Sequence, residues 1–181
     1  MIEVPQPEVE LDREPSLLSI EEQVARLFEQ TRTEVYRYLL TLGLEAGRAQ
    51  EAVQEVFMRL YRALKKKDDI LNRRAWVFRV AHNVGLRLRS RESSMRPFDA
   101  DLALRLADPQ PNPEKSAIDR ERTLRLHRAV ETLSPQQRQC LHLRAEGFRY
   151  REIASILGIS DSSVGEFLRR AIEKLRKATH E

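Results

Sequence analysis

Gly158 separates two helical patterns near the end of this sequence, and it constrains the fold more than any other feature. Before it, apolar residues at helical spacing predict a short helix; they are Ile153, Ala154 and Leu157. After it, an apolar face predicts a longer helix; it comprises Val164, Leu168, Ala171, Ile172 and Leu175. Glycine favours a left-handed exit from the first helix, and Ser160 or Asp161 offers an oxygen that caps the second. The pattern is typical of a helix-turn-helix, although an ordinary helical hairpin is the alternative.

Positive charge gathers in two separate parts of the sequence. Residues 62–96 hold 11 cations and 3 anions, and residues 120–181 hold 13 cations and 8 anions. Residues 97–119, with 2 cations and 5 anions, lie between them. The outer face of the predicted longer helix contributes Arg169, Arg170, Lys174, Arg176 and Lys177. Two basic blocks around an acidic stretch predict two contacts with a polyanion such as DNA.

The composition argues against several classes of protein. The 181 residues are 41% hydrophobic and 33% charged with 6 glycines, which predicts a folded chain of long helices. No apolar run could span a membrane or form a signal peptide, so we expect a cytoplasmic protein without membrane insertion. Cys140 is the only cysteine and the 4 histidines are scattered, so we expect Cys140 in a core, no disulfide, no metal and no cofactor. No catalytic motif occurs, so an enzyme is not expected.

The sequence divides into two predicted helical domains, at residues 16–94 and 117–178. Residues 1–15 carry prolines and acids and read as a disordered tail. Residues 95–116 have the proline-rich, acidic composition of a flexible linker. The predicted fold class is therefore all-α, with two small domains joined by a linker.

Helix boundaries can be read from capping residues. Ser19 begins a first helix that ends near Gly43, and a second runs from about Arg48 to Leu64. Their short connection predicts an antiparallel pair. A third helix is expected at residues 73–91. In the second domain, helices are expected near 116–132 and from Ser134, before the helix-turn-helix.

Trp76 and Phe78 lie among the cations of the third helix. Aromatic rings there could stack on unpaired bases, because every base offers a flat face. Apolar residues at the same helical spacing favour core packing for both.

Three segments resemble bacterial RNA polymerase sigma factors of the sigma-70 family. QEVFMRLYRAL (residues 54–64) and RAWVFRVAHNVGLRLRSR (74–91) are similar to region 2 of that family. LSPQQRQCLHLRAEGFRYREIASILGISDSSVGEFLRRAIEKLR (133–176) is similar to region 4. The two regions follow each other with no helical domain between them, and this arrangement resembles the extracytoplasmic-function subgroup. The resemblance implies a region 2 three-helix bundle at 16–94 and a region 4 helix-turn-helix at 117–178.

The resemblance also implies three interfaces. Core polymerase would bind the exposed face of the second helix, at Gln50, Gln54, Glu55 and Arg59. The separated strand of the minus-ten element would bind the third helix, at Arg79, Asn83, Arg87 and Arg89. The minus-thirty-five element would receive the last helix in its major groove, at Ser162, Ser163, Glu166, Arg169 and Arg170. We further expect an anti-sigma partner that clamps the two DNA-binding halves.

The sequence departs from the family pattern at two places. Arg48 stands where the polymerase-binding helix usually begins with an acid. In the last helix, Gly165 and Phe167 replace common cations, and Glu166 adds an acid. Glycine costs a helix up to about 1 kcal/mol relative to alanine. We therefore expect weaker or unusual upstream recognition, with Glu166 accepting a hydrogen bond from cytosine N4.

Two other functions fit parts of the pattern. A stand-alone helix-turn-helix regulator would bind duplex DNA as a symmetric dimer and would not need the basic third helix. An adaptor that binds only proteins would not need the basic block at residues 62–96. Specific transcript initiation with core polymerase distinguishes these functions from a sigma factor.

Overall fold

A computed structural model describes residues 18–91, 125–126 and 128–180, with backbone only for 178–180. Its helices are α1 (Ile20–Thr41), α2 (Ala46–Lys65), α3 (Arg73–Arg91), α6 (Pro135–Ala145), α7 (Tyr150–Leu157) and α8 (Asp161–His180). Residues 125–126 and 128–131 are also helical. No strand occurs in these ranges, which confirms the all-α prediction. The predicted tail (1–15), the linker (95–116) and most of the helix predicted near 116–132 lie outside the described residues.

Two helix starts follow the predicted capping residues closely. The Ser19 hydroxyl accepts the Glu22 N–H at 3.1 Å, and the Glu22 carboxylate accepts the Ser19 N–H at 2.8 Å. The Ser134 hydroxyl and the Gln137 amide side chain make the same pair of bonds at 3.2 and 2.9 Å before α6. Each box satisfies two N–H groups that the first helical turn leaves open.

The helix-turn-helix forms as the glycine pattern predicts. Gly158 ends α7 with φ 68°, in the left-handed region that only glycine adopts readily. The Ser160 hydroxyl accepts the Ser163 N–H at 3.2 Å, so Ser160 caps α8 and Asp161 is its first residue. The turn therefore fixes the direction of α8 relative to α7.

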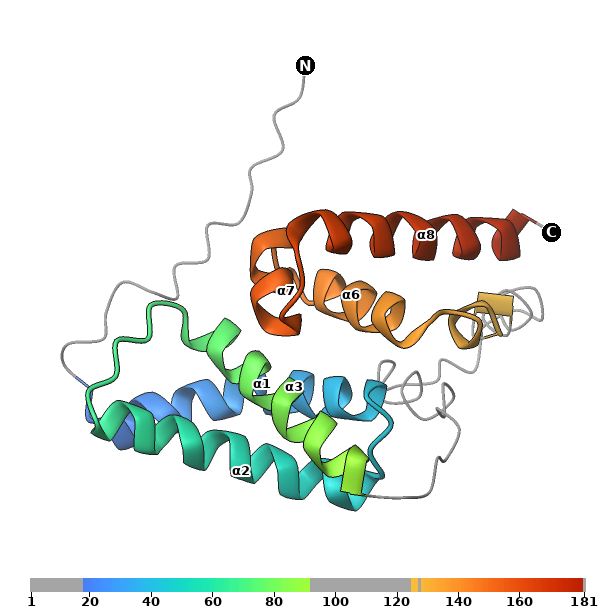
Figure 1. Cartoon of the computed structure of the whole chain (residues 1–181). Helices are drawn as coiled ribbons and strands as arrows, with labels where there is room; N and C mark the ends of the chain where they lie inside the picture. The colour runs from blue at the N-terminus through green and yellow to red at the C-terminus, as the bar shows by residue number, and fades with distance from the viewer. Residues whose placement is uncertain (1–17, 92–124, 127, 181) are drawn as a thin grey trace, which may run out of the picture.

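The helices form two layers, with α1, α2 and α3 in one and α6, α7 and α8 in the other (Figure 1). α1 packs on α2 and both pack on α3, while α8 packs on α6 and α7. Between the layers, α3 contacts α7 and α1 contacts α6. One cluster of buried residues runs through both layers. The two predicted halves are thus packed against each other.

Several core predictions can be checked residue by residue. Phe78 and Cys140 are fully buried, as expected, and Trp76 packs at the edge of the core. Ile172 is 43% exposed, so its predicted burial is wrong. The buried residues of α8 fall at positions 164, 168 and 171, and Ile172 lies about 100° further round the helix from Ala171. In α7, Ile153 and Ala154 are buried as expected, Leu157 packs partly against the core, and Ile156 is buried as well.

Among the described helices, none combines the length and the apolar character needed to cross a lipid bilayer.

Candidate nucleic-acid interface

The outer face of α2 holds the residues predicted to bind polymerase. Gln50 and Gln54 are exposed, and Glu55 and Arg59 are half-buried beside them. All four lie outside the buried stripe of α2, with Gln50 and Gln54 toward one border of the exposed side and Glu55 and Arg59 toward the other. Met58, 50% exposed, adds an apolar contact to this face.

Glu55 joins the α2 face to the DNA-binding face predicted on α3. One oxygen of its carboxylate accepts from Arg59 Nη2 at 2.6 Å and from Arg87 Nη2 at 2.6 Å. Partial burial alone would raise the pKa of Glu55, but the bonds from Arg87 and Arg59 outweigh it and lower that pKa. Arg59 and Arg87, predicted for different partners, thus share one counter-ion.

Arg79, Asn83 and Arg87 lie on one exposed face of α3, because they are spaced four residues apart. Arg89 is also exposed but turns aside, where its Nη1 donates to the Leu42 carbonyl oxygen at the end of α1 at 3.2 Å. The structure therefore groups three of the four predicted minus-ten residues. Leu86, 42% exposed, lies on the same face three residues after Asn83, and it was not among the residues predicted from the sequence. That spacing alone could have identified it.

A buried polar pair supports α3 from behind. The Tyr38 hydroxyl and His82 Nδ1 lie 2.9 Å apart, with Tyr38 fully buried and His82 6% exposed. Burial lowers the pKa of His82, so its ring is neutral near pH 7. The bond ties α3 to α1 and so fixes the face that carries Asn83.

On α8, the predicted upstream residues lie on its outer side, beginning at the first turn. Ser162 and Ser163 surround the capping hydroxyl of Ser160, at oxygen–oxygen distances of 2.9 and 2.8 Å. Arg169 and Arg170 are exposed one to two turns later. A helix N-terminus that presents hydroxyls and then cations is suited to the phosphates and base edges of a major groove.

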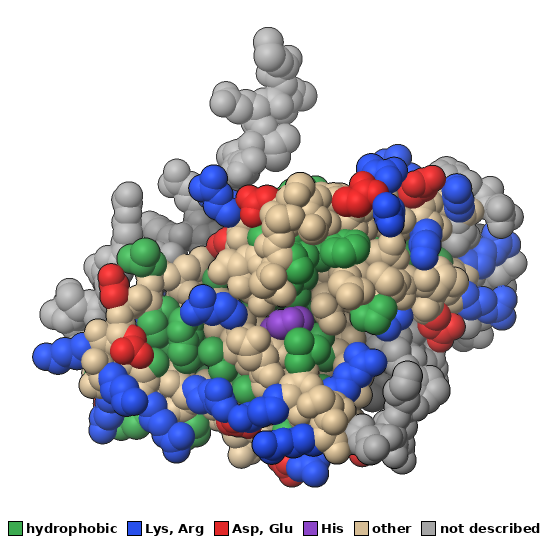
Figure 2. All heavy atoms as spheres, in the orientation of Figure 1, with side chains coloured by type: hydrophobic (Ala, Val, Ile, Leu, Met, Phe, Trp, Pro, Cys, Tyr) green, Lys and Arg blue, Asp and Glu red, His purple; other side chains and the backbone are tan. Residues whose placement is uncertain are grey.

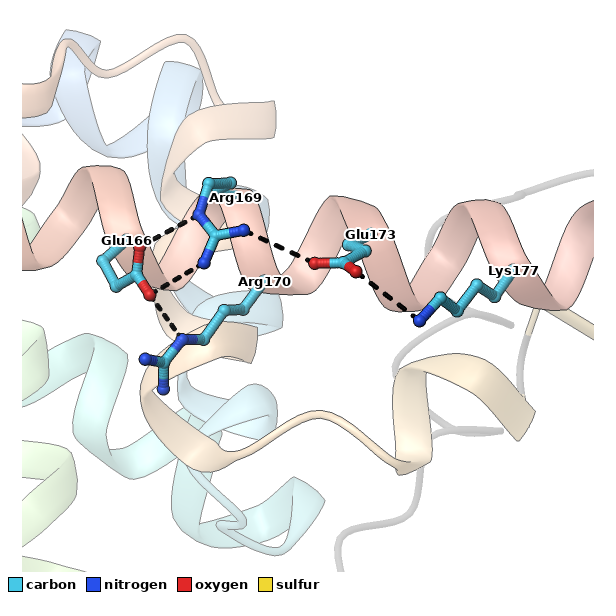
Figure 3. A network of polar contacts seen from close by, with 5 residues as sticks. All are labelled: Glu166, Arg169, Arg170, Glu173 and Lys177. Carbon is cyan, nitrogen blue, oxygen red and sulfur yellow. Dashed lines mark hydrogen bonds and ion pairs between the residues drawn. The ribbon is translucent and has the colours of Figure 1, made fainter.

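Glu166 begins an ion-pair network that runs along this helix (Figure 3). Its carboxylate accepts two bonds from Arg169, both 3.0 Å, and one from Arg170 at 2.6 Å. These arginine bonds lower the pKa of Glu166 to about 2, so the carboxylate is charged at neutral pH. Glu173 extends the row, 3.5 Å from Arg169 and 3.5 Å from Lys177. One carboxylate therefore pairs with both predicted DNA-binding arginines within α8, and the three groups together keep a net positive charge.

The residues that depart from the family pattern have different structural settings. Phe167 packs partly against the core, so it does not occupy the DNA-facing side. Gly165 has open space around it, since an added Cβ would meet only Tyr150 Cε2 at 3.8 Å. Glycine is therefore not required there by packing. At the start of α2, Arg48 pairs with Glu51 at 3.0 Å.

Basic side chains spread over both layers on one face of the molecule (Figure 2). They lie around a hydrophobic area between the layers and gather most densely along the outer edges. Cationic faces on both halves are the electrostatic footprint of a protein that binds nucleic acid.

Comparisons with known proteins match both halves. The family model described as "Sigma-70 region 2" matches residues 27–94, and the one described as "Sigma-70, region 4" matches residues 123–175. The extracytoplasmic-function (ECF) RNA polymerase sigma factor SigE of Mycolicibacterium smegmatis is 28% identical to this chain. The match covers 83% of this chain and 59% of SigE. RfaY of Xanthomonas campestris, a probable sigma factor, is 28% identical over 83% of this chain. The chain spans only 39% of RfaY.

A solved structure shares the fold. The sigma factor RpoE of Bartonella quintana, crystallised with the anti-sigma factor NepR, superimposes with a TM-score of 0.63 at 19% identity. The match covers 87% of this chain and 96% of RpoE. Since the two matched regions together span more than half of the sequence, the chain belongs to the sigma-70 family of RNA polymerase sigma factors, in the extracytoplasmic-function subgroup.

Proposed function

We propose that this chain is a promoter-specificity subunit, which directs bacterial core RNA polymerase to a set of promoters and starts transcription there. One observation supports it above the others. Exposed cationic faces occur on both α3 and α8, in the two halves that match sigma regions 2 and 4. In this proposal residues 16–94 bind polymerase and the minus-ten element, and residues 117–178 bind the minus-thirty-five element.

Polymerase binds the polar face of α2. Gln50, Gln54, Glu55 and Arg59 supply hydrogen bonds to a partner helix, and Met58 supplies an apolar anchor among them. A helix that offers such a mixed face suits docking against another helix. Glu55 then lies between the polymerase and the DNA, because its carboxylate also accepts a hydrogen bond from Arg87, which binds DNA in this proposal.

Strand separation occurs at α3. Arg79 and Arg87 bind phosphates of the displaced strand, Asn83 reads an extruded base, and Arg89 contributes charge at the end of the helix. Leu86 gives an unstacked base an apolar surface. Binding to the separated strand offsets the free energy of melting, so the chain needs no nucleotide hydrolysis and performs no catalysis itself.

The minus-thirty-five element is read by α8. Ser162 and Ser163 approach the duplex at the helix N-terminus, and Arg169 and Arg170 follow the phosphate backbone. Glu166 lies between them and contacts a base edge. An anti-sigma protein holds the chain inactive until a signal arrives, as the NepR complex of RpoE suggests for a related fold.

Run-off transcription tests the function directly. The purified full chain and core polymerase are incubated with a promoter library, and start sites are mapped. We expect specific starts with both proteins together and none with either alone. An Arg79→Ala, Arg87→Ala double variant should still bind polymerase but lose initiation. Occupancy of palindromic duplex sites by the chain alone, without any specific starts, would instead identify a stand-alone regulator.

A further inference from the structure

Gly165 leaves a position without a side chain on the surface of α8 that is proposed to read DNA. On a helix surface, the neighbours of a residue are those three and four positions away along the chain. For Gly165 these include Ser162 and Arg169, which are both exposed and both proposed to contact the upstream duplex. The missing side chain therefore lies between two candidate DNA contacts.

Neither backbone conformation nor packing requires glycine at this position. The glycines with positive φ are Gly43, Gly147 and Gly158, so Gly165 has backbone angles that alanine adopts equally well. An added Cβ at Gly165 would meet only Tyr150 Cε2, at an ordinary contact distance of 3.8 Å. Alanine would also strengthen the helix, because glycine is a poor helix former. A further use of glycine is to let another molecule approach the backbone closely.

Tyr150, the first residue of α7, borders the space beside Gly165. It is 45% exposed, and its ring carbon Cε2 faces the point where a Cβ of residue 165 would stand. We call this space the Gly165 gap; its walls are the Cα of Gly165 and the edge of the Tyr150 ring. Both walls are carbon, so the gap is apolar, although Ser162 and Arg169 lie beside it on α8.

The Tyr150 ring is held in place from α6 and from the core. Arg144 lies over the ring, with its Cζ 5.7 Å from the ring centroid, and its Nη1 donates to the Phe148 carbonyl oxygen at 3.1 Å. Phe148 is 2% exposed and Ile153 is fully buried, so the chain is anchored on both sides of Tyr150. The ring therefore has a defined position relative to α8, as a residue that reads DNA requires.

The chemistry of the gap selects one group among those that a major groove presents. Most base-edge groups there are hydrogen-bond donors or acceptors, which need polar partners. The exception is the methyl group on C5 of thymine, which proteins recognise by apolar contact. The gap has room for about one methyl group, because a single added Cβ already reaches contact distance from the Tyr150 ring.

We propose that the Gly165 gap receives the methyl group of a thymine in the minus-thirty-five element, with the Tyr150 ring as its second wall. This inference rests on the proposed function, because it requires α8 to lie in the major groove. Tyr150 is then a specificity-determining residue that α7 contributes. Residue 165 is glycine because any side chain there would occupy the place of the methyl group.

Deoxyuridine tests the proposal, because it differs from deoxythymidine only in lacking this methyl group. Holoenzyme assembled from the full chain and core polymerase is titrated onto a promoter whose start site has been mapped. Each thymine of the minus-thirty-five element is replaced in turn by deoxyuridine. At one of them we expect binding to weaken about fourfold, the usual contribution of one buried methyl or methylene group. Gly165→Ala and Tyr150→Ala should each bind the two duplexes equally.

Tyr150→Phe is the matched control for Tyr150→Ala. It keeps the ring and removes only the hydroxyl, so it should retain the preference for thymine over deoxyuridine. Loss of the preference in Tyr150→Phe would assign the effect to the hydroxyl and refute the apolar contact.

Urea unfolding of Gly165→Ala tests the geometry of the gap without DNA. The variant should be at least as stable as the parent chain, since the added Cβ fits beside Tyr150 and alanine favours the helix. A lower urea midpoint would show that packing requires the glycine, and this would overturn the proposal.

The remaining outcomes separate this inference from the proposed function. If initiation is specific but no thymine responds to deoxyuridine, or if Gly165→Ala keeps the preference, the methyl contact is refuted and the function stands. If Gly165→Ala weakens binding to both duplexes equally, the gap receives the sugar-phosphate backbone instead. If Gly165→Ala also co-elutes less with core polymerase in the absence of DNA, the gap receives protein. If the unmodified chain starts no specific transcription with core polymerase, the proposed function fails and the inference fails with it.

Discussion

At Glu166, a single carboxylate pairs with both arginines that the DNA-reading helix offers to phosphates. A carboxylate has about four lone-pair sites, and Arg169 and Arg170 occupy three of them with their three bonds. One site remains for a base edge such as cytosine N4. Glu166 therefore has two roles in the proposed complex, as a reader and as a counter-ion that competes with DNA.

We predict that Glu166→Gln strengthens binding to the minus-thirty-five duplex at low salt. Removing the charge frees Arg169 and Arg170 for phosphates, and each added phosphate contact steepens the dependence of log K on log salt by about 0.9. Titrating holoenzyme onto labelled duplex over a range of KCl concentrations measures both effects. Glu29→Gln, an exposed acid on α1, is the control and should leave the slope unchanged. An unaltered slope in Glu166→Gln would mean that the arginines already reach the phosphates.

Base preference gives a separate prediction for the same residue. Glu166→Ala should relax the preference at one position of the upstream element by about 1–3 kcal/mol, the usual discrimination of a good base contact. Mapping transcription starts selected from a randomised promoter library measures this base preference. If the preference is the same with alanine, Glu166 is a counter-ion only and does not read cytosine.

At the scale of elements, the close approach of α3 to α1 depends on Gly85. A Cβ at this position would meet Leu42 Cδ1 at 2.5 Å and Leu39 Cδ2 at 3.1 Å. Both leucines are fully buried, so neither can move without disturbing its neighbours. In the sequence, helical spacing marks Gly85 only as part of a helix. The need for a residue without a side chain follows from the position of α1.

We predict that Gly85→Ala lowers the free energy of unfolding by about 1–2 kcal/mol. Overpacking typically costs about 1–3 kcal/mol, and the better helix propensity of alanine recovers up to about 1 kcal/mol. Gly47→Ala is the matched control, because nothing lies within 4 Å of its added Cβ in α2, and it should be neutral or stabilising. Urea unfolding of both variants measures their free energies of unfolding. Equal stability of the two would show that α3 can shift away from α1.

At the scale of the whole molecule, His142 couples the contact between the halves to pH. Its ring lies against Tyr38 of the other half, and Arg37 and Glu146 face it. Burial, with help from the Arg37 cation, lowers its pKa to about 4. Burial and the nearby Glu34 carboxylate raise the pKa of Glu146. The neutral imidazole is therefore the form that the folded, packed arrangement of the two halves favours.

We predict that the folded chain loses stability as the pH falls from about 6.5 to 4. In that window the unfolded chain takes up a proton at His142 and the folded chain does not, so the free energy of unfolding falls by up to about 3 kcal/mol. Protonation of Glu146 opposes part of this loss, since its raised pKa favours proton uptake in the folded state. Urea midpoints at pH 7 and pH 5 measure the change. His142→Phe should flatten it, and an equally steep decline in that variant would assign the pH dependence to other groups.

Capping residues, helical spacing and the glycine turn are enough to determine most of the helices from the sequence. Ser19, Ser134 and Gly158 act locally, through hydrogen bonds and φ angles within a few residues, and local signals can be read in order along a chain. The same holds for the exposed positions of the candidate interfaces, because helical spacing separates Arg79, Asn83 and Arg87 from the buried side.

Only the tertiary structure decided which residues from distant segments meet. The sharing of Glu55 by Arg59 and Arg87, the burial of Phe78 against Phe148 and the link from Arg74 to Glu146 each join separate helices. The sequence predicted two helical halves but not which of their residues meet, since no helical period encodes a contact between segments so far apart along the chain. Such contacts depend on how whole surfaces fit together, and that fit exists only once the helices are assembled.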